Sequence, residues 1–273
     1  MKLKGTVAIV TGASRGIGAA TARSLHKKGV TVGLLARSGA DLAALADELE
    51  TDVAIAEADI ADRIRVEGAV AALTRELGPP DILVNNAGIG AYASILEEDP
   101  DCYERLMQVN YLGTVHATRA VLPGMVERRR GHIVNVASVA GKLGAPFEAA
   151  YSASKFAVVG FTESLAAEAA PFGIGVSLVN PGPVDTDFTD ARGVPFQRRV
   201  PHPIKPERVA KAIVAAIEDE TFEQLLPRWL RLGVVTRAVA PGSYRRGLIR
   251  DSKKDGAELV ARIQPRRDDE PTE

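Results

Sequence analysis

From residue 6 to about residue 220, short apolar runs rich in β-branched residues alternate with longer stretches of helical periodicity. The runs of strand type cover residues 6–10, 30–35, 53–55, 82–84, 132–136, 174–179 and 222–226. Most of these runs are apolar on both faces, as strands must be when helices cover both sides of a sheet. The alternation is typical of βαβ units. It predicts an α/β fold in which about seven strands form a doubly wound parallel sheet flanked by helices.

Between the strand runs, apolar residues recur at the spacing of one helix face. Leu42, Leu45 and Leu49 mark one such face, and Val66 begins another that continues through residues 70, 73 and 77. No linker or shift in composition interrupts this region, so we expect residues 1–224 to form one domain. Residues 225–273 differ, because arginines and apolar residues are interleaved there. We expect a helical C-terminal extension followed by a solvated tail.

Composition and charge exclude several classes of protein. The 34 Lys+Arg and 35 Asp+Glu give a net charge of −1, so no global basic field exists to hold nucleic acid. The single cysteine, Cys102, excludes an internal disulfide and is expected to be a small apolar filler. The four histidines lack ligand spacing, so no metal site is predicted. With no leader peptide or membrane-spanning run, a cytoplasmic protein is expected.

A glycine-rich turn, residues 11–18, directly follows the first predicted strand. Gly12 allows the sharp turn, Gly16 lets the backbone approach a pyrophosphate, and Gly18 lets the next helix pack close to the sheet. The helix N-terminus would face the anion. In this strand–turn–helix context the motif predicts a Rossmann-type dinucleotide site more strongly than a tight structural turn. The other candidate contacts of the turn are Ser14, Arg15 and Ile17.

The end of the second predicted strand indicates which dinucleotide is preferred. An acidic residue there would accept the ribose hydroxyls of NAD, but the chain has Ala36 and then Arg37. A guanidinium favours the 2′-phosphate of NADP, and Arg15 could supply a second one. The alternative is that Arg37 is only a solvated residue leading into a helix. The adenosine end of the site is expected to be completed by Ser38, Asp59 and Ile60.

Tyr151 and Lys155 are four residues apart and therefore share one face of a predicted helix. A phenol with a pKa near 10 is a poor base at neutral pH, and an adjacent ammonium stabilises its phenolate. The pair therefore predicts proton transfer through Tyr151. Taken alone, Tyr151 could also be a buried packing aromatic whose hydroxyl is satisfied.

These motifs, together with Asn110, Ser138, residues 85–88 and residues 181–186, resemble the single-domain, NADP-preferring branch of the short-chain dehydrogenase/reductase family. The resemblance covers residues 5–220 in order and spacing. It implies that Tyr151 is the general acid in reduction and the base in oxidation, and that Ser138 hydrogen-bonds the substrate oxygen. Lys155 would hold the nicotinamide ribose and lower the pKa of Tyr151, and Asn110 would hold a water of a proton relay.

The same resemblance implies further cofactor contacts and an assembly. Its expected contacts along the cofactor and at the nicotinamide end are Asn86, Ala87, Gly88, Pro181, Gly182, Val184 and Thr186. The alanine-rich run at residues 166–170 would lie in a helix that commonly forms a subunit interface in this family. A homodimer or homotetramer is therefore expected.

The expected function is NADP(H)-dependent interconversion of a carbonyl and a secondary alcohol by hydride transfer. One alternative is a nucleotide-sensing or regulatory binding protein on the same fold, although pure binding needs no Tyr151–Lys155 pair. The other alternative is a non-redox reaction, such as that of an epimerase or dehydratase.

Two segments bear on the substrate. The substrate loop is expected at residues 187–204, and with residues 89–95 and 142–147 it forms a largely apolar wall, which favours a small, uncharged and fairly hydrophobic carbonyl or alcohol. For residues 225–250 two interpretations stay open. They could lie on a membrane surface, with Trp229 and leucines in the interface and arginines on anionic headgroups, or pack over the pocket or a subunit contact.

Overall fold

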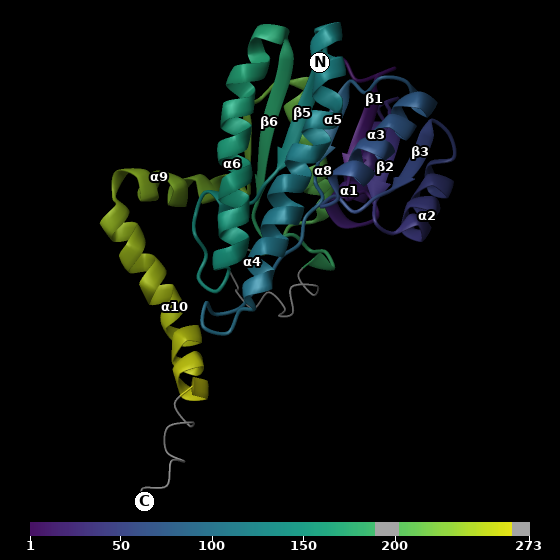
Figure 1. Ribbon diagram of the computed structural model, residues 1–273. Coiled ribbons are helices and arrows are strands. Elements are labelled where there is room, and N and C mark those ends of the chain that lie inside the picture. Colours follow the sequence, from purple (N-terminus) through teal and green to yellow (C-terminus); the bar gives the residue numbers. More distant parts are fainter. Residues whose placement is uncertain (189–201, 264–273) are drawn as a thin grey trace, which may run out of the picture.

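The predicted strands all belong to one parallel sheet. The computed structural model describes residues 1–188 and 202–263. Within them the strand order is β3-β2-β1-β4-β5-β6-β7, and every strand pair is parallel. The strands are β1 (Val7–Thr11), β2 (Thr31–Ala36), β3 (Val53–Glu57), β4 (Ile82–Asn85), β5 (Gly131–Val136), β6 (Ile174–Pro181) and β7 (Glu223–Leu226). The α/β, doubly wound expectation is confirmed (Figure 1).

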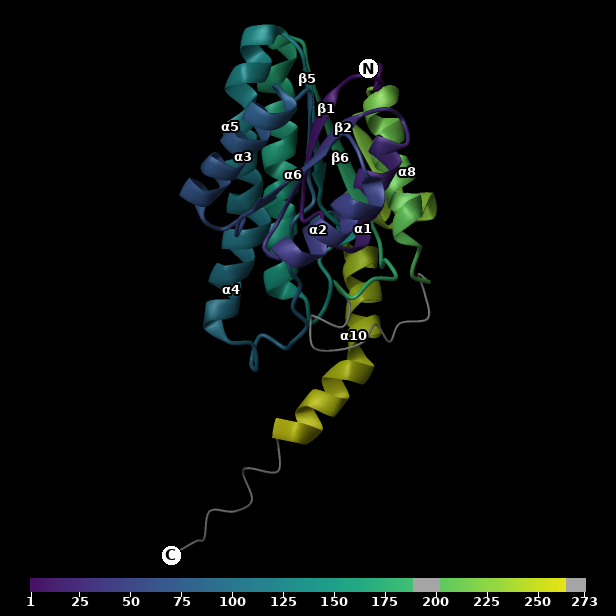
Figure 2. The ribbon, with the colours of Figure 1, turned by 90° about the vertical axis from the view of Figure 1, so that its right-hand side faces the viewer.

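Helices cover both faces of the sheet, as Figure 2 shows edge-on. One face packs against α1 (Gly16–His26), α2 (Gly39–Leu49) and α8 (Pro206–Glu218). The other packs against α3 (Arg63–Leu77), α5 (Gly113–Arg128) and α6 (Ala149–Ala169), with α4 (Pro100–Leu106) before α5. Because both faces are covered, a separate apolar core forms on each side of the sheet.

The expected helix faces are the buried ones. Leu42, Leu45 and Leu49 of α2 and Val66 of α3 are buried. The first helix begins at Gly16, so Gly16 and Gly18 of the glycine turn lie in its first turn. Most of the expected substrate loop, residues 189–201, lies outside the described residues.

The sheet order reverses between β1 and β4, and this positions the site. The chain runs from β1 outward to β2 and β3, then returns to pair β4 with the other side of β1. Loops leaving neighbouring strands in opposite directions open a crevice at the carboxyl ends of the strands. The turn after β1 and the loop after β4 border this crevice.

After β7 the chain forms the expected helical C-terminal region. A short 3₁₀ turn, Arg228–Leu230, leads into α9 (Arg231–Val239) and then α10 (Pro241–Ile263). In Figure 1, α9 lies beside α6 and α10 runs away from the sheet. Among the described residues, none of the helices combines the length and the apolar run that crossing a bilayer requires.

A chain of buried side-chain hydrogen bonds ties the central strands to the helices over them. Asn85 at the end of β4 donates to Thr118 Oγ1 (3.0 Å) and to Asn135 Oδ1 (2.8 Å). Asn135 in β5 donates in turn to Thr162 Oγ1 in α6 at 2.9 Å. All four residues are essentially inaccessible to solvent. An unpaired polar group at this depth is costly, so the network fixes how α5 and α6 sit on the sheet.

Replacing Asn135 tests this network. We expect Asn135→Ala to lower the free energy of unfolding by about 2–3 kcal/mol, because it leaves a buried donor of Asn85 without its acceptor. Urea unfolding of the variant measures the loss. The matched control is Gln108→Ala, which removes an exposed amide and should stay within about 0.5 kcal/mol of the wild type. Equal stability of the two variants would contradict the assignment.

Candidate functional site

A cavity of about 1150 Å³ lies in the crevice at the carboxyl ends of the strands. It begins at the turn after β1 and extends to the C-terminal helices α9 and α10. Gly18 and Asn110 lie outside its lining. The structure brings the remaining predicted site residues together around it: Gly12, Ser14, Arg15, Gly16, Ile17, Arg37, Ser38, Asp59, Ile60, Asn86, Ala87, Gly88, Ser138, Tyr151, Lys155, Pro181, Gly182, Val184 and Thr186.

The glycine turn is held against the loop after β4 by close backbone packing. A Cβ atom on Gly12 would lie 2.8 Å from the Cα of Ala87, and one on Gly18 would overlap the carbonyl oxygen of Gly12. Asn86 closes the turn, donating from Nδ2 to the carbonyls of Thr11 (3.0 Å) and Gly12 (3.2 Å). Gly18 therefore acts on the site indirectly, by letting α1 approach the sheet.

The N-terminus of α1 faces the cavity. Arg15 is its N-cap residue, and Ser14, Gly16 and Ile17 line the cavity beside it. Among the described residues no side chain caps this end of the helix, so its first backbone N–H groups are available to another acceptor. Such an end attracts anions through its dipole and its unpaired donors.

Two arginines line the cavity, one after β1 and one after β2. Arg37 follows β2, is exposed, and has no carboxylate partner among the described residues. The exposed Arg15, at the N-terminus of α1, lies 3.9 Å from a carboxylate oxygen of Asp187. Ser38 caps α2 by accepting a hydrogen bond from the backbone N–H of Asp41 at 3.3 Å. The lining therefore includes one guanidinium at the end of β2 and another at the N-terminus of α1.

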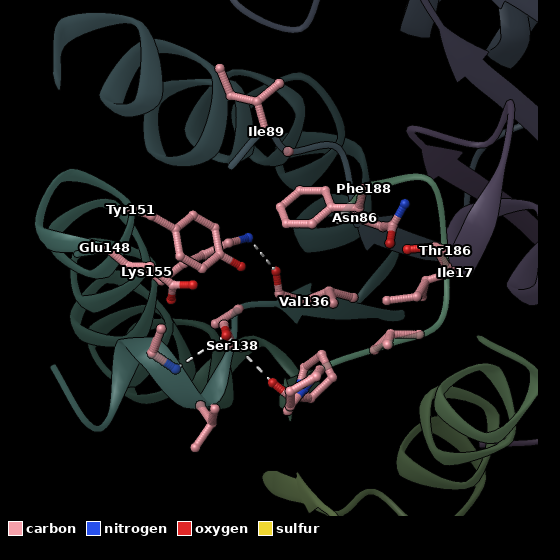
Figure 3. Close-up of a pocket in the computed structure, with 18 of the residues that line it drawn as sticks. Ile17, Asn86, Ile89, Val136, Ser138, Glu148, Tyr151, Lys155, Thr186 and Phe188 are labelled. Atoms are coloured by element: carbon pink, nitrogen blue, oxygen red, sulfur yellow. Dashed lines mark hydrogen bonds between the residues drawn. The ribbon is translucent and has the colours of Figure 1, made fainter. Parts of the chain in front are cut away.

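Tyr151 and Lys155 lie on the first turns of α6 and point into the cavity (Figure 3). Lys155 is buried, and its ammonium lies 5.9 Å from the centre of the Tyr151 ring and donates to the carbonyl of Val136 at 3.1 Å. Burial lowers the pKa of Lys155 to about 8. The Lys155 ammonium therefore stays mostly protonated at neutral pH. Because its charge is poorly solvated, an anion formed next to it would stabilise it.

Ser138 lies two residues after the end of β5 and precedes a 3₁₀ turn, Val139–Gly141. Its Oγ accepts from the backbone N–H of Ala140 at 3.1 Å and donates to the carbonyl of Pro181 at 3.4 Å. The second of these bonds is long, so the hydroxyl proton can turn to another acceptor at little cost. Figure 3 shows Ser138 on the same side of the cavity as Tyr151 and Lys155.

Asn110 has a structural position next to the cavity. It lies in a π-helical segment, Met107–Leu112, and its amide bonds both backbone groups of Ile89, at 2.8 and 3.0 Å. Its Nδ2 also donates to Ser154 Oγ at 2.9 Å. The amide thereby fixes the loop after β4 and the helix that carries Lys155. A water-holding role for Asn110 stays a prediction.

Some residues that line the cavity are not among the predicted site residues. Glu148 stands at the N-terminus of α6, three residues before Tyr151, and lines the cavity (Figure 3). Phe188 packs its ring 5.9 Å from that of Tyr151. The three-residue spacing of Glu148 from Tyr151 was a usable signal. Phe188 belongs to the expected substrate loop, residues 187–204, but its contact with Tyr151 depends on the path of that loop, which no local pattern indicates.

The C-terminal helices supply another part of the wall. Their lining residues are Leu230, Gly233, Thr236, Ser243, Tyr244, Gly247 and Leu248. Arg237 holds α9 to the body of the domain, because it donates to the carbonyl of Lys142 at 2.7 Å and lies 4.9 Å from the centre of the Phe156 ring. Tyr244 of α10 donates to the carbonyl of Gly144 at 3.4 Å. Residues 225–250 thus lie over the cavity.

The residues present fit a nicotinamide dinucleotide. Gly12 and Gly18, which approach their neighbours closely, leave bare backbone at two positions of the turn before α1, and a Cβ on Gly16 would lie 3.2 Å from Thr186. One end of the cavity offers cations and the other offers a tyrosine and a buried lysine. By contrast, no cluster of metal-binding side chains occurs in the described part of the chain. Burial and the neighbouring Glu98 raise the pKa of Cys102 to about 11, which makes its thiol a poor nucleophile.

Comparison with known proteins agrees with this geometry. The family model for short chain dehydrogenase matches residues 6–194. Dehydrogenase/reductase SDR family member 7B of Bos taurus is 32% identical over 270 residues, which are 93% of this chain and 83% of that protein.

Two solved structures share the fold over most of their length. A short-chain dehydrogenase/reductase of Burkholderia phymatum in complex with NAD has a TM-score of 0.80 and 29% identity, over 87% of this chain and 94% of that one. A short-chain dehydrogenase of Burkholderia cenocepacia in complex with NADP has a TM-score of 0.79 and 31% identity, over 91% and 99%. With the matched family model and the convergent Tyr151, Lys155 and Ser138, this protein belongs to the short-chain dehydrogenase family.

Proposed function

We propose that this protein is an NADP(H)-dependent oxidoreductase that interconverts a carbonyl and a secondary alcohol of an apolar substrate. The observation that carries the proposal is the convergence of Tyr151, Lys155 and Ser138 in a cavity continuous with the glycine turn of α1. A protein that only binds a nucleotide has no use for a buried ammonium beside a phenol. The pair is useful where a proton must move to or from a reacting oxygen.

The residues divide the chemistry among them. NADPH, when bound, supplies the hydride that reduces the carbonyl carbon. Ser138 turns its hydroxyl from the Pro181 carbonyl to the substrate oxygen and orients it. Tyr151 donates its phenolic proton to that oxygen. Lys155 stabilises the resulting phenolate, because its charge is buried and otherwise bonded to the Val136 carbonyl. In the oxidative direction Tyr151 accepts the proton instead.

Arg37 and Arg15 support a preference for NADP over NAD. Arg37 lies where a dinucleotide fold recognises the 2′ position of the ribose, has no carboxylate partner among the described residues, and follows the neutral Ala36. Planar guanidinium groups bind phosphate oxygens through paired, charge-assisted hydrogen bonds. A ribose with free hydroxyls would leave Arg37 without such a partner, whereas Arg15 already lies 3.9 Å from Asp187.

An apolar substrate is supported by the wall opposite the glycine turn. Leu143, Phe188, Leu230 and Leu248 line this part of the cavity. Two glycines, Gly144 and Gly247, also line it, and no described atom lies within 4 Å of where their Cβ atoms would be. A glycine inside a helix, as Gly247 is, costs stability. Here it leaves open space for a substrate.

Removing the Tyr151 hydroxyl tests the proposed proton transfer. We expect Tyr151→Phe to lower kcat for NADPH-dependent carbonyl reduction by about 10²–10⁴-fold, because no proton donor remains. NADPH binding, followed by quenching of protein fluorescence, should persist. The control Tyr111→Phe removes a hydroxyl outside the cavity, where the ring packs against Phe161, and should leave kcat unchanged. Near-normal turnover by Tyr151→Phe would refute the assignment.

Reversing the charge of Arg37 tests the cofactor preference. Arg37→Asp should lower the ratio of kcat/KM for NADPH to kcat/KM for NADH by about 10–100-fold, since a charge-assisted contact is lost and a carboxylate faces the phosphate. The matched control is Arg75→Asp, an exposed arginine on α3 outside this cavity. If the ratio moves equally in both variants or in neither, Arg37 does not discriminate between the cofactors.

Filling the space at Gly247 tests the apolar substrate. Gly247→Leu should lower kcat/KM for long-chain aliphatic ketones about tenfold or more and leave that for short ones unchanged, because the side chain occupies the open part of the cavity. Gly160→Leu is the control, since Gly160 is also a helix glycine with open space around it but lies outside the lining. A uniform loss for all chain lengths would contradict a role in accommodating the chain.

A further inference from the structure

The C-terminal helices also carry exposed residues that do not line the cavity, and we call these residues together the outer face. Its apolar residues are Trp229, Leu232, Val235, Val239 and Ile249, and its basic residues are Arg228, Arg231, Arg245, Arg246 and Arg250. In α9, Leu232, Val235 and Val239 follow helical spacing, whereas Gly233 and Thr236 turn toward the cavity. The two sides of α9 therefore differ in what they contact.

The apolar residues of the outer face are strongly exposed. The exposed fractions are 69% for Leu232, 75% for Val239 and 49% for Trp229. Leu232, Val235 and Val239 share one face of α9, so these three exposed side chains lie next to one another rather than at isolated surface positions. Exposed apolar groups rimmed by charge are typical of surfaces that contact a membrane or another molecule.

The charge of this segment is one-sided. Residues 227–250 contain six arginines and no acidic residue, although the whole chain has a net charge of −1. Within the part of the chain that the structure describes, none of the six is paired with a carboxylate. Arg237 contacts its own domain, because its guanidinium donates to the Lys142 carbonyl and lies over the Phe156 ring. The other five carry positive charge next to exposed apolar side chains.

We propose that the outer face docks on an anionic lipid bilayer. Apolar side chains of an interfacial helix enter the boundary between headgroups and acyl chains, while arginines remain at the level of the anionic headgroups. Each basic residue near such a surface adds to the attraction. The outer face has both apolar and basic side chains. It lies on two helices that are held to the body of the protein, α9 by Arg237 and α10 by Tyr244.

A second copy of the chain suits this face less well. A two-fold contact places the same patch of both copies together. Here that would bring two sets of unpaired arginines into contact without any carboxylate from residues 227–250 to neutralise them. An anionic bilayer meets the same apolar groups and supplies the missing negative charge.

Docking in this way would bring the cavity to the lipid. Leu230, Gly233 and Leu248 line the cavity from the same helices that carry the outer face. The C-terminal helices alone would then separate the bilayer from the cavity, which shortens the path of an apolar substrate between the two. This consequence depends on the proposed function, but docking itself does not.

Vesicle sedimentation of the full chain tests the docking. We expect the protein to pellet with vesicles of equal parts phosphatidylcholine and phosphatidylserine, to remain in the supernatant with phosphatidylcholine alone, and to dissociate as salt is raised. The variant Leu232→Asp/Val239→Asp should bind the anionic vesicles about tenfold or more weakly, because two apolar side chains no longer enter the interface. Neither residue lines the cavity, so NADPH binding should be unchanged.

Two further variants make the test decisive. Ile64→Asp is the matched control, because Ile64 on α3 is 72% exposed and lies far from residues 227–250 in the chain, and it should bind vesicles like the wild type. Arg231→Glu/Arg245→Glu should also weaken binding, and it replaces the first variant if that one has an altered melting curve.

Three results would overturn the proposal. The first is wild-type protein that does not pellet with anionic vesicles. The second is equal vesicle binding by the wild type and the outer-face variants. The third combines two observations: the wild type does not bind vesicles, and without lipid the sedimentation coefficient of Leu232→Asp/Val239→Asp is lower than that of the wild type. This result would show that the outer face contacts a second copy of the chain. Carbonyl reduction is not measured in any of these arms, so failure of docking is distinguishable from failure of the proposed function.

Discussion

The whole site depends on how closely the first helix approaches the middle of the sheet. At Gly12 and Gly18 there is no room for a Cβ atom, and Asn86 fills the remaining gap by bonding the carbonyls of the turn. This contact aligns the uncapped end of α1 with the crevice between β1 and β4, where the strand order reverses. A larger residue at either glycine would push the helix outward and turn its N–H groups away from the crevice. The anion-binding end of the cavity is thus a result of backbone packing more than of side chains.

The other end of the cavity depends on a charge that is unfavourable where it stands. Lys155 is buried with one backbone carbonyl as its hydrogen-bond acceptor, and burial brings its pKa down to about 8. Such a site costs folding free energy while the lysine is protonated. In the proposed reaction, a negative charge developing on the neighbouring phenol would relieve that cost, so the buried ammonium would favour the reacting state. The buried network through Asn85 and Asn135 and the bonds of Asn110 hold α6, and with it this lysine, in place.

Features that rest on local periodicity and short spacings could be predicted from the sequence. The seven strands, the leucine face of α2, the turn at residues 11–18 and the Tyr151–Lys155 pair are of this kind. Other features depend on where distant segments meet. Asn110 is near Lys155 in space, yet its amide forms hydrogen bonds with Ile89 and Ser154. No local sequence pattern indicates these hydrogen bonds. The packing of Tyr244 against Gly144 joins positions one hundred residues apart. The expected homo-oligomer stays a prediction.

The two-sided character of α9 has a geometric consequence. Successive residues of an α-helix are rotated by about 100° around its axis, so the inner and outer faces of α9 are locked in phase. Inserting one residue directly after Leu230 would turn Leu232 by about 100° into the place of Gly233 in the cavity wall, and deleting one residue there would move Gly233 into the exposed place of Leu232. Point substitutions can vary either face separately, but the length of this stretch cannot change without altering both. Relatives with a different loop length before α9 would therefore need a compensating change in register to keep this arrangement.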